Sequence, residues 1–178
     1  MKRIVVLDHQ ITEKFQIKQK GLLWSVFAFL AHSGDSWFWL VGIGLVWVFG
    51  NQPWHDRAAI MGIAVFILAV LVLSLKFTFK RKRPESEWGK IYRNTDPHSF
   101  PSGHAARAFL LAVLALGLGP EWFGLLLIIW APLVCLARIL MGVHYFSDVL
   151  GGIIIGSLFG VLMLWVNPLL MRLLPFLY

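Results

Sequence analysis

Long apolar runs separated by short polar connections dominate the sequence and predict an all-α integral membrane protein. The clearest runs approach the length that an α-helix needs to cross a bilayer, and they cover residues 37–50, 58–79, 101–119, 122–137 and 144–166. A sixth run, residues 15–31, contains Lys18 and Lys20. It either spans the membrane, with its lysine side chains reaching the interface, or lies in the interface. We favour the spanning helix. We expect a single domain over residues 1–178, a bundle of about six transmembrane helices whose first helix is short or interfacial.

The alternation of these spans places four helix ends at one membrane face. Successive spans run in opposite directions, so the ends at positions 79 and 137 lie beside the starts at positions 101 and 144. The only long connection, residues 80–100, lies at the same face. The most notable polar residues occur at these ends or in this connection: Lys76, Arg83, Ser102, His104, Arg138, His144 and Asp148. The sequence therefore predicts that distant segments build one polar site at the membrane surface.

Composition supports a membrane location. Hydrophobic residues make up 58% of the chain and charged residues 14%, with a mean hydropathy of +0.74, which argues against a soluble domain. The net charge of +7 is concentrated in residues 1–20 and 80–93, so we expect the bilayer and its anionic lipids, and no nucleic acid, as partners. Cys135 is the only cysteine, so the chain can form no internal disulfide.

The segment FPSGHAARAF, residues 100–109, places polar residues where an apolar helix begins. We expect Ser99 to cap this helix, with Pro101 in its first turn. The backbone N–H groups of Ser102, Gly103 and His104 would then point outward at the positive helix end and bind an anion, with the Ser102 hydroxyl as a further donor. The alternative is a capped helix with an incidental interfacial histidine.

The segment KFTFKRKRP, residues 76–84, contributes two cations of different reach. Lys76 lies near the end of a span, and Arg83 precedes Pro84, which prevents a helix from continuing. The planar guanidinium of Arg83 matches phosphate oxygens, whereas Lys76 offers a point charge. The three basic residues at positions 80–82 are better explained by attraction to lipid headgroups or by topology signalling.

The segment ARILMGVHYFSD, residues 137–148, holds a histidine and an aspartate four residues apart. On a helix, Asp148 would accept a hydrogen bond from one ring nitrogen of His144 and leave the other as a nucleophile. Arg138 would have to fold back over this site. The pair could instead be half of a metal site, but no nearby cysteine, third carboxylate or HExxH pattern supports one. We therefore expect no metal and no cofactor.

These three motifs resemble the signatures of the type 2 phosphatidic acid phosphatase (PAP2) superfamily. The matching segments are Lys76 to Pro84, Pro101 to His104, and Arg138 with His144 and Asp148, within residues 70–165. Ala137 stands where the family usually has Ser, so this chain lacks the hydroxyl that could donate a hydrogen bond there. Soluble vanadate-dependent haloperoxidases share the site of this superfamily, but the membrane composition argues against that class.

The resemblance implies a metal-independent lipid phosphatase that works through a phosphohistidine intermediate. His144 would attack phosphorus, Asp148 would orient His144, and His104 would protonate the departing oxygen and later activate water. The residues that would hold the phosphate oxygens are Lys76, Arg83, Ser102, Gly103 and Arg138. The substrate would be an isoprenoid (undecaprenyl) diphosphate or a glycerophospholipid phosphate such as phosphatidic acid or phosphatidylglycerol phosphate.

Arg107 lies outside the three motifs but is costly at its depth in a span. The form Pro-Ser-Gly-His-Ala-x-Arg is similar to family members that act on isoprenoid diphosphates, so Arg107 is a candidate contact for a second phosphate or for the headgroup linkage. The alternatives are a snorkelling cation or a structural pair with an acid: Glu85, Glu87 or Asp96.

The same pattern bears on the membrane face at which the site lies and on two alternative functions. The count of Lys and Arg on each face leaves out the motif residues. If the first helix spans, more Lys and Arg lie opposite the site than beside it, which favours an extracytoplasmic site in the cell membrane. If the first helix is interfacial, the count is reversed. A transporter would need polar residues near mid-bilayer, where these spans are apolar. A non-catalytic protein that binds anionic lipid would not need the His144 and Asp148 pair.

Overall fold

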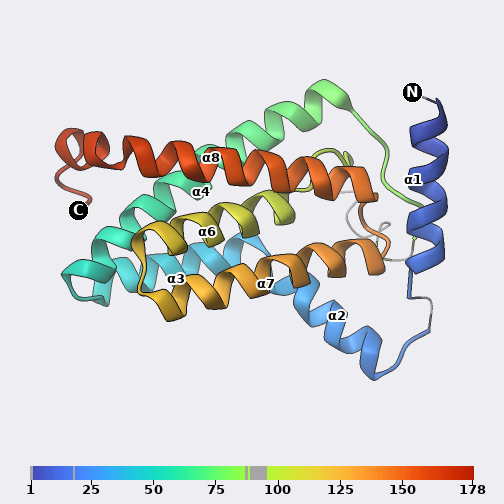
Figure 1. Ribbon diagram of the computed structural model, residues 1–178, viewed down its shortest axis with the longest axis horizontal. Helices are drawn as coiled ribbons and strands as arrows, with labels where there is room; N and C mark the ends of the chain where they lie inside the picture. The colour runs from blue at the N-terminus through green and yellow to red at the C-terminus, as the bar shows by residue number, and fades with distance from the viewer. Residues whose placement is uncertain (1, 18, 87, 89–95) are drawn as a thin grey trace.

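The computed structural model describes residues 2–17, 19–86, 88 and 96–178 and contains seven helices within these ranges (Figure 1). The helices are α1 (Lys2–Phe15), α2 (Leu22–Ser33), α3 (Ser36–Phe49), α4 (Gln52–Phe79), α6 (Gly103–Leu118), α7 (Glu121–Leu140) and α8 (Phe146–Leu173). The prediction of an all-α membrane bundle is confirmed.

The long helices lie roughly side by side, and α1 crosses one end of the bundle (Figure 1). Helices α4, α7 and α8 are each long and apolar enough to cross a membrane, and α6 is a shorter apolar helix. Helices α2 and α3 are long enough only together, and the bend of 56° at the break between them makes the pair a broken span or a re-entrant loop. Residues 15–31 therefore do not form a separate span, because α1 ends at Phe15 and α2 continues into α3.

Helix boundaries differ from the sequence expectations at three places. Helix α4 begins at Gln52 with Pro53 in its first turn, where the missing N–H costs nothing, so the expected connection at residues 51–57 is mostly helical. Lys80 has a φ of 49°, and this left-handed residue ends α4 before Pro84 is reached. Helix α8 begins only at Phe146, so His144 precedes the helix instead of lying in it.

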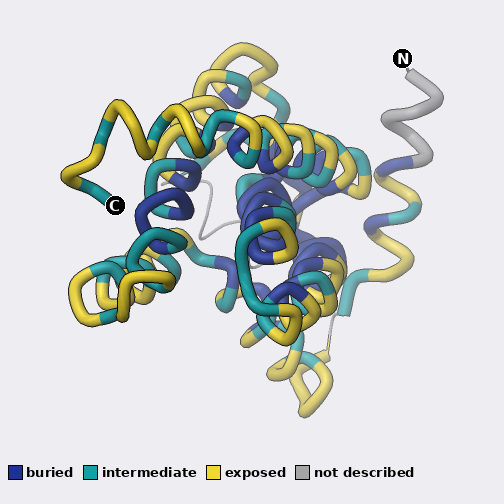
Figure 2. The backbone as a smooth tube through the Cα atoms, turned by 60° about the vertical axis from the view of Figure 1, so that its left-hand side comes forward, coloured by how far each residue is buried: buried dark blue, intermediate teal, exposed yellow. Residues whose placement is uncertain are grey.

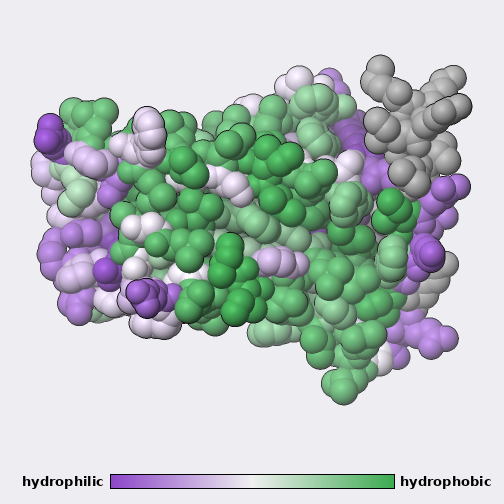
Figure 3. All heavy atoms as spheres, viewed as in Figure 1, coloured by the Kyte–Doolittle hydropathy of each residue, from purple (hydrophilic) through white to green (hydrophobic). Residues whose placement is uncertain are grey.

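Helix α6 is the centre of the bundle, between α4, α7 and α8 (Figures 1 and 2). Its alanines are fully buried, and they let neighbouring backbones approach closely. The other long helices turn large apolar side chains outward, among them Phe66, Ile129 and Trp165. In the space-filling view, the middle of the visible face is apolar and hydrophilic residues lie at both ends (Figure 3). An apolar middle between two hydrophilic ends is the surface expected of a protein that lies in a bilayer.

Three glycines of α8 fix how closely it packs on α6. Gly152, Gly156 and Gly160 recur every fourth residue and therefore lie on one face. A Cβ added at Gly156 would lie 2.0 Å from the carbonyl oxygen of Ala106, and one at Gly152 would lie 2.5 Å from that of Ser102. This close contact brings the first turns of the two helices together, where the Ser102 N–H donates to the Asp148 carbonyl at 2.9 Å.

We expect Gly156→Ala to lower the free energy of unfolding by about 1–3 kcal/mol, because its methyl group would force α8 away from α6. Thermal unfolding in detergent measures the effect. Gly44→Ala in α3 is the matched control, since nothing lies within 4 Å of a Cβ there. Equal transitions for the two variants would contradict this packing.

Candidate active site

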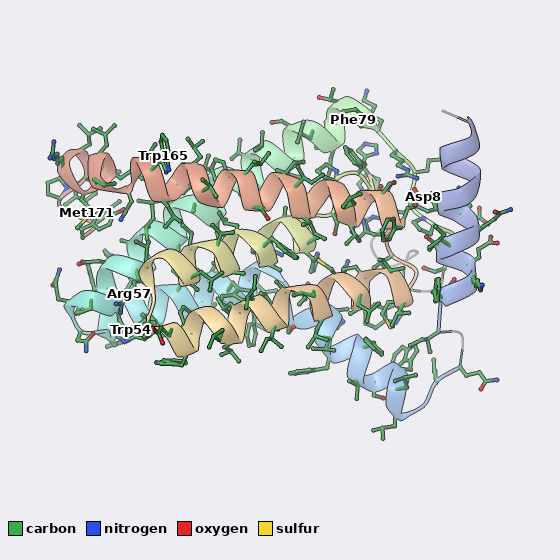
Figure 4. The ribbon with its side chains drawn as sticks, in the orientation of Figure 1. Asp8, Trp54, Arg57, Phe79, Trp165 and Met171 are labelled. Carbon is green, nitrogen blue, oxygen red and sulfur yellow. The ribbon has the colours of Figure 1, made fainter. Side chains whose placement is uncertain are left out.

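The four helix ends that were predicted to share one face lie together at the α1 end of the bundle (Figures 1 and 4). The predicted motif side chains are almost completely buried there: Lys76, Arg83, Ser102, Arg138, His144 and Asp148. Burial of several charges is costly unless each is compensated, and such clusters are typical of functional sites.

Lys76 and Arg83 converge on a single anionic oxygen. Arg83 Nη2 donates to Asp96 Oδ2 at 2.7 Å, and Lys76 Nζ donates to the same oxygen. The other guanidinium nitrogen of Arg83, Nη1, lies 3.2 Å from His144 Nε2. The carboxylate of Asp96 thus stands in for an anion bound by two cations beside an imidazole nitrogen.

His144 lies in the turn between α7 and α8. Its Nδ1 is 3.6 Å from Asp148 Oδ2, beyond ordinary hydrogen-bond distance, and its Nε2 faces Arg83. Burial lowers the pKa of His144 well below its ordinary value, and the positive charges of Arg83 and Arg138 lower it further. The lowered pKa favours the neutral ring, which is the form that can act as a nucleophile.

Two donors hold Asp148 from the other side. The Tyr145 N–H donates to Asp148 Oδ2 at 2.9 Å in a capping box, and Arg81 Nη1 donates to Oδ1 at 2.7 Å. The guanidinium of Arg81 also lies 4.2 Å from the centre of the Tyr145 ring. Arg81 is thus part of the site and not only a membrane-facing charge, which the basic run alone did not indicate.

Asp8 links α1 to this site. Its Oδ2 accepts hydrogen bonds from Arg81 Nη2 at 2.6 Å and Ser147 Oγ at 2.5 Å, and its Oδ1 accepts the Ser147 N–H at 3.1 Å. Burial raises the pKa of Asp8, but the donors Ser147 and Arg81 outweigh it, and the net pKa is lowered. Asp8 therefore stays charged and holds α1 across the site end of the bundle (Figure 4).

The first turn of α6 differs from its predicted form. Ser102, not Ser99, is the N-cap, and its side chain accepts a hydrogen bond from the Ala105 N–H at 3.5 Å. Helix α6 starts at Gly103, and the Ser102 N–H is directed to the Asp148 carbonyl instead of outward.

Ser99 has a different role. It is fully buried, and its hydroxyl lies 3.3 and 3.2 Å from the carbonyl oxygens of Arg81 and Lys82. Its N–H also donates to the Arg81 carbonyl at 2.8 Å. Ser99 therefore joins the two ends of the long connection.

His104 contacts a carboxylate that the sequence motifs do not include. Its Nε2 lies 2.6 Å from Asp35 Oδ1, at the break between α2 and α3. Asp35 was missed because it belongs to none of the motifs. The available signal was the polar stretch HSGD, residues 32–35, between two apolar runs.

Arg107 lies one turn deeper in α6 and binds the same break. Its Nε donates to the Gly34 carbonyl at 3.0 Å, and its Nη2 donates to the same oxygen. Within the described residues, the structure records no ion pair between Arg107 and Glu85 or Asp96, and Glu87 lies outside those residues. In place of the acid considered as an alternative, Arg107 binds a backbone carbonyl.

Arg138 is fully buried at the end of α7 and lies 3.5 Å from the Ala31 carbonyl through its Nη1. Ala137, at the position of the family serine, is also fully buried and belongs to an apolar cluster with Ala28 and Ala31 of α2. A methyl group suits this contact with α2 better than a hydroxyl would.

A cavity of about 190 Å³ opens beside these groups. Its polar lining comes from Lys76, Asp96, His104 and Arg107, and its apolar lining comes from residues of α4 such as Leu68 and Val72. No group of three or more metal-ligating side chains occurs in the described part of the chain. Cations dominate the polar lining, and the cavity joins them to apolar side chains of α4, so its chemistry suits an anionic amphiphile.

Comparisons with known proteins agree with this geometry. The sequence profile of the PAP2 superfamily matches residues 57–172, more than half of the chain. An undecaprenyl-diphosphatase of Sulfolobus acidocaldarius is 31% identical over 147 residues, which cover 78% of this chain and 68% of that protein. A decaprenylphosphoryl-5-phosphoribose phosphatase of Mycobacterium tuberculosis is 32% identical over 138 residues, covering 75% of this chain and 74% of that protein.

A solved structure has the same fold. The crystal structure of a transmembrane PAP2-type phosphatidylglycerolphosphate phosphatase from Bacillus subtilis superposes with a TM-score of 0.77 at 24% identity, covering 97% of this chain and 90% of that chain. The chain belongs to the PAP2 superfamily and is a membrane lipid phosphatase.

Proposed function

We propose that the protein hydrolyses a phosphomonoester or diphosphate headgroup through a phosphohistidine and without a metal. His144 Nε2 attacks phosphorus, and an N–P bond forms as the bond from phosphorus to the leaving oxygen breaks. His104 gives that oxygen a proton. Water then attacks phosphorus as the N–P bond breaks, His104 takes a proton from that water, and inorganic phosphate leaves His144.

The observation that carries this proposal is the shared anion position beside His144. Lys76 and Arg83 bind one carboxylate oxygen of Asp96, and Arg83 also lies 3.2 Å from His144 Nε2. A phosphoryl oxygen that replaces the carboxylate would bind the same two cations. Its phosphorus would then lie close to a neutral imidazole nitrogen.

The remaining groups align the phosphate and spread its charge. Arg138 adds a third cation, and the first turn of α6 offers Ser102 and Gly103 at a positive helix end. Asp148, whose Oδ2 lies 3.6 Å from His144 Nδ1, would orient His144 once this distance closes to a hydrogen bond. Phosphoryl transfer needs mainly alignment and neutralisation of charge, and these side chains supply both.

The proposed substrate is an isoprenoid diphosphate or a glycerophospholipid phosphate. The relatives named above act on undecaprenyl diphosphate, a decaprenyl-linked phosphate and phosphatidylglycerol phosphate. The cavity supports this class, because it leads from the polar site to apolar residues of α4. Arg107 lines the cavity near His104, where a second phosphate would follow the first.

A non-catalytic lipid-binding protein would need the cations but not a neutral histidine beside them.

We propose an extracytoplasmic site, as in most of the superfamily. The charge count is reversed and now opposes this choice, because α1 lies at the site end and brings its lysines, such as Lys14, to that face. Arg57 and Arg172 remain at the opposite end. Cations such as Arg81 are engaged in the site, so they are weak indicators of topology.

Phosphate release tests the reaction. We expect purified protein with EDTA to release phosphate from isoprenoid diphosphates or glycerophospholipid phosphates, and His144→Ala to lower kcat by about a thousandfold or more, since the nucleophile is lost. His55→Ala, at the other end of the bundle, is the control and should retain activity. Equal activity of wild type and His144→Ala would refute a histidine nucleophile, and inactivity of both would favour a lipid-binding role.

Arg107→Ala tests the second-phosphate contact. If Arg107 binds a second phosphate, kcat/KM for the diphosphate should fall about tenfold to a hundredfold, because a charged hydrogen bond is lost. The monophosphate should be much less affected. Equal losses on the two substrates would instead favour a structural role through Gly34.

Single-cysteine labelling tests the sidedness. In a Cys135→Ser background, Lys14→Cys should react with a membrane-impermeant maleimide on intact cells, and Asp56→Cys should react only after lysis. The opposite pattern would place the site at the cytoplasmic face.

A further inference from the structure

The break between α2 and α3 brings four polar backbone or side-chain groups into the bundle. Such a break is stable in a membrane only if these groups find partners. The Ser33 carbonyl accepts from Trp39 Nε1, and the Ser33 hydroxyl accepts from Trp130 Nε1, both at 2.9 Å. The Gly34 carbonyl accepts from Arg107. The fourth group, the carboxylate of Asp35, has partners of a different kind.

Asp35 bridges two histidines. Its Oδ1 lies 2.6 Å from His104 Nε2, and its Oδ2 lies 3.0 Å from His32 Nδ1. The side chain of His104 is 14% exposed and that of Asp35 is 20% exposed, whereas His32 is 55% exposed. The short contact of Asp35 is thus with the buried histidine of the site.

The position of Asp35 does not reflect a helix-capping role. Asp35 is the N-cap residue of α3, where aspartate usually accepts a hydrogen bond from the first turn, but its side chain makes no such bond. The carboxylate is instead directed at His104. An aspartate retained only to start α3 would not need this orientation.

Gly34 shows that the break also packs against the imidazole. A Cβ at Gly34 would lie 3.2 Å from His104 Cδ2 and 3.0 Å from Val134 Cγ1. The ring is therefore held at its edge by the backbone of the break and at Nε2 by a carboxylate. These two contacts come from one four-residue segment, HSGD.

We propose that Asp35 is a positioning residue for His104, an inference that rests on the proposed function. The carboxylate accepts the Nε2 proton, fixes the ring orientation and stabilises the imidazolium. Nδ1 is then the nitrogen that gives its proton to the leaving oxygen as the P–O bond breaks, and it takes a proton from water in the second step. The Nε2 proton stays between His104 and Asp35 throughout.

Substrates with different leaving groups distinguish a positioning role of Asp35 from a purely structural one. An alkoxide leaving group of a lipid phosphate needs a proton, whereas p-nitrophenolate leaves without one. Since kcat/KM reports the step that forms the phosphohistidine, Asp35→Asn should lower kcat/KM for a lipid phosphate about tenfold to a hundredfold, within the range of general acid catalysis. The loss for p-nitrophenyl phosphate should stay within about threefold, because that substrate bypasses the acid.

Three further variants sharpen the comparison. His104→Ala should show the same selectivity with a larger loss, Asp35→Glu should recover part of the lipid phosphate activity, and Asp56→Asn is the matched control at the far end of the bundle. The ratio of the two kcat/KM values does not depend on the fraction of folded enzyme, so partial misfolding does not mask the result.

An unchanged kcat/KM ratio in Asp35→Asn, whether from equal losses or from no loss, would overturn the proposal. Wild-type protein that releases phosphate from neither of these substrates, nor from an isoprenoid diphosphate, would overturn the proposed function itself. The two failures are therefore distinguishable.

Discussion

The mutual repulsion of buried cations is the constraint on which the site depends. Lys76, Arg83 and Arg138 come from three different segments and lie almost completely out of water. They can remain together only around negative charge, which the chain supplies through Asp96 on the phosphate side. In this arrangement Asp96 occupies the position proposed for the phosphate, so the resting site resembles its own liganded state.

Three structural supports hold the reacting groups around this charge cluster. The glycine face of α8 on α6 sets the distance between their first turns. Asp8 of α1 accepts a hydrogen bond from Arg81, and Arg81 in turn holds Asp148. The break between α2 and α3 holds His104 through Asp35. Each histidine thus has its own carboxylate, and the two carboxylates belong to separate supports, which would allow the proposed nucleophile and the proposed acid to be tuned independently.

The sequence predicted the fold and the gathering of its motif residues better than their local geometry. Alternating apolar spans place helix ends on one face whatever their details, so Lys76 and His144 could be expected together. Hydrogen-bond partners such as Asp8 and Asp35 depend on how α1 and the α2–α3 pair dock. No periodicity encodes that docking. The placement of α1 could not be predicted for the same reason. Hydropathy alone does not distinguish a single short span over residues 15–31 from the end of a surface helix, α1, followed by α2, the first half of the bent helix pair.

Direct detection of a phosphoryl group on His144 tests the central claim most directly. His104→Ala should slow hydrolysis of the intermediate, because water is no longer activated. This variant would be mixed with p-nitrophenyl phosphate, quenched at alkaline pH and digested for mass spectrometry. The proposed mechanism predicts a phosphorylated peptide containing His144, absent from the His144→Ala variant. Turnover of this substrate with no phosphorylated peptide, or with phosphate on another residue, would contradict it.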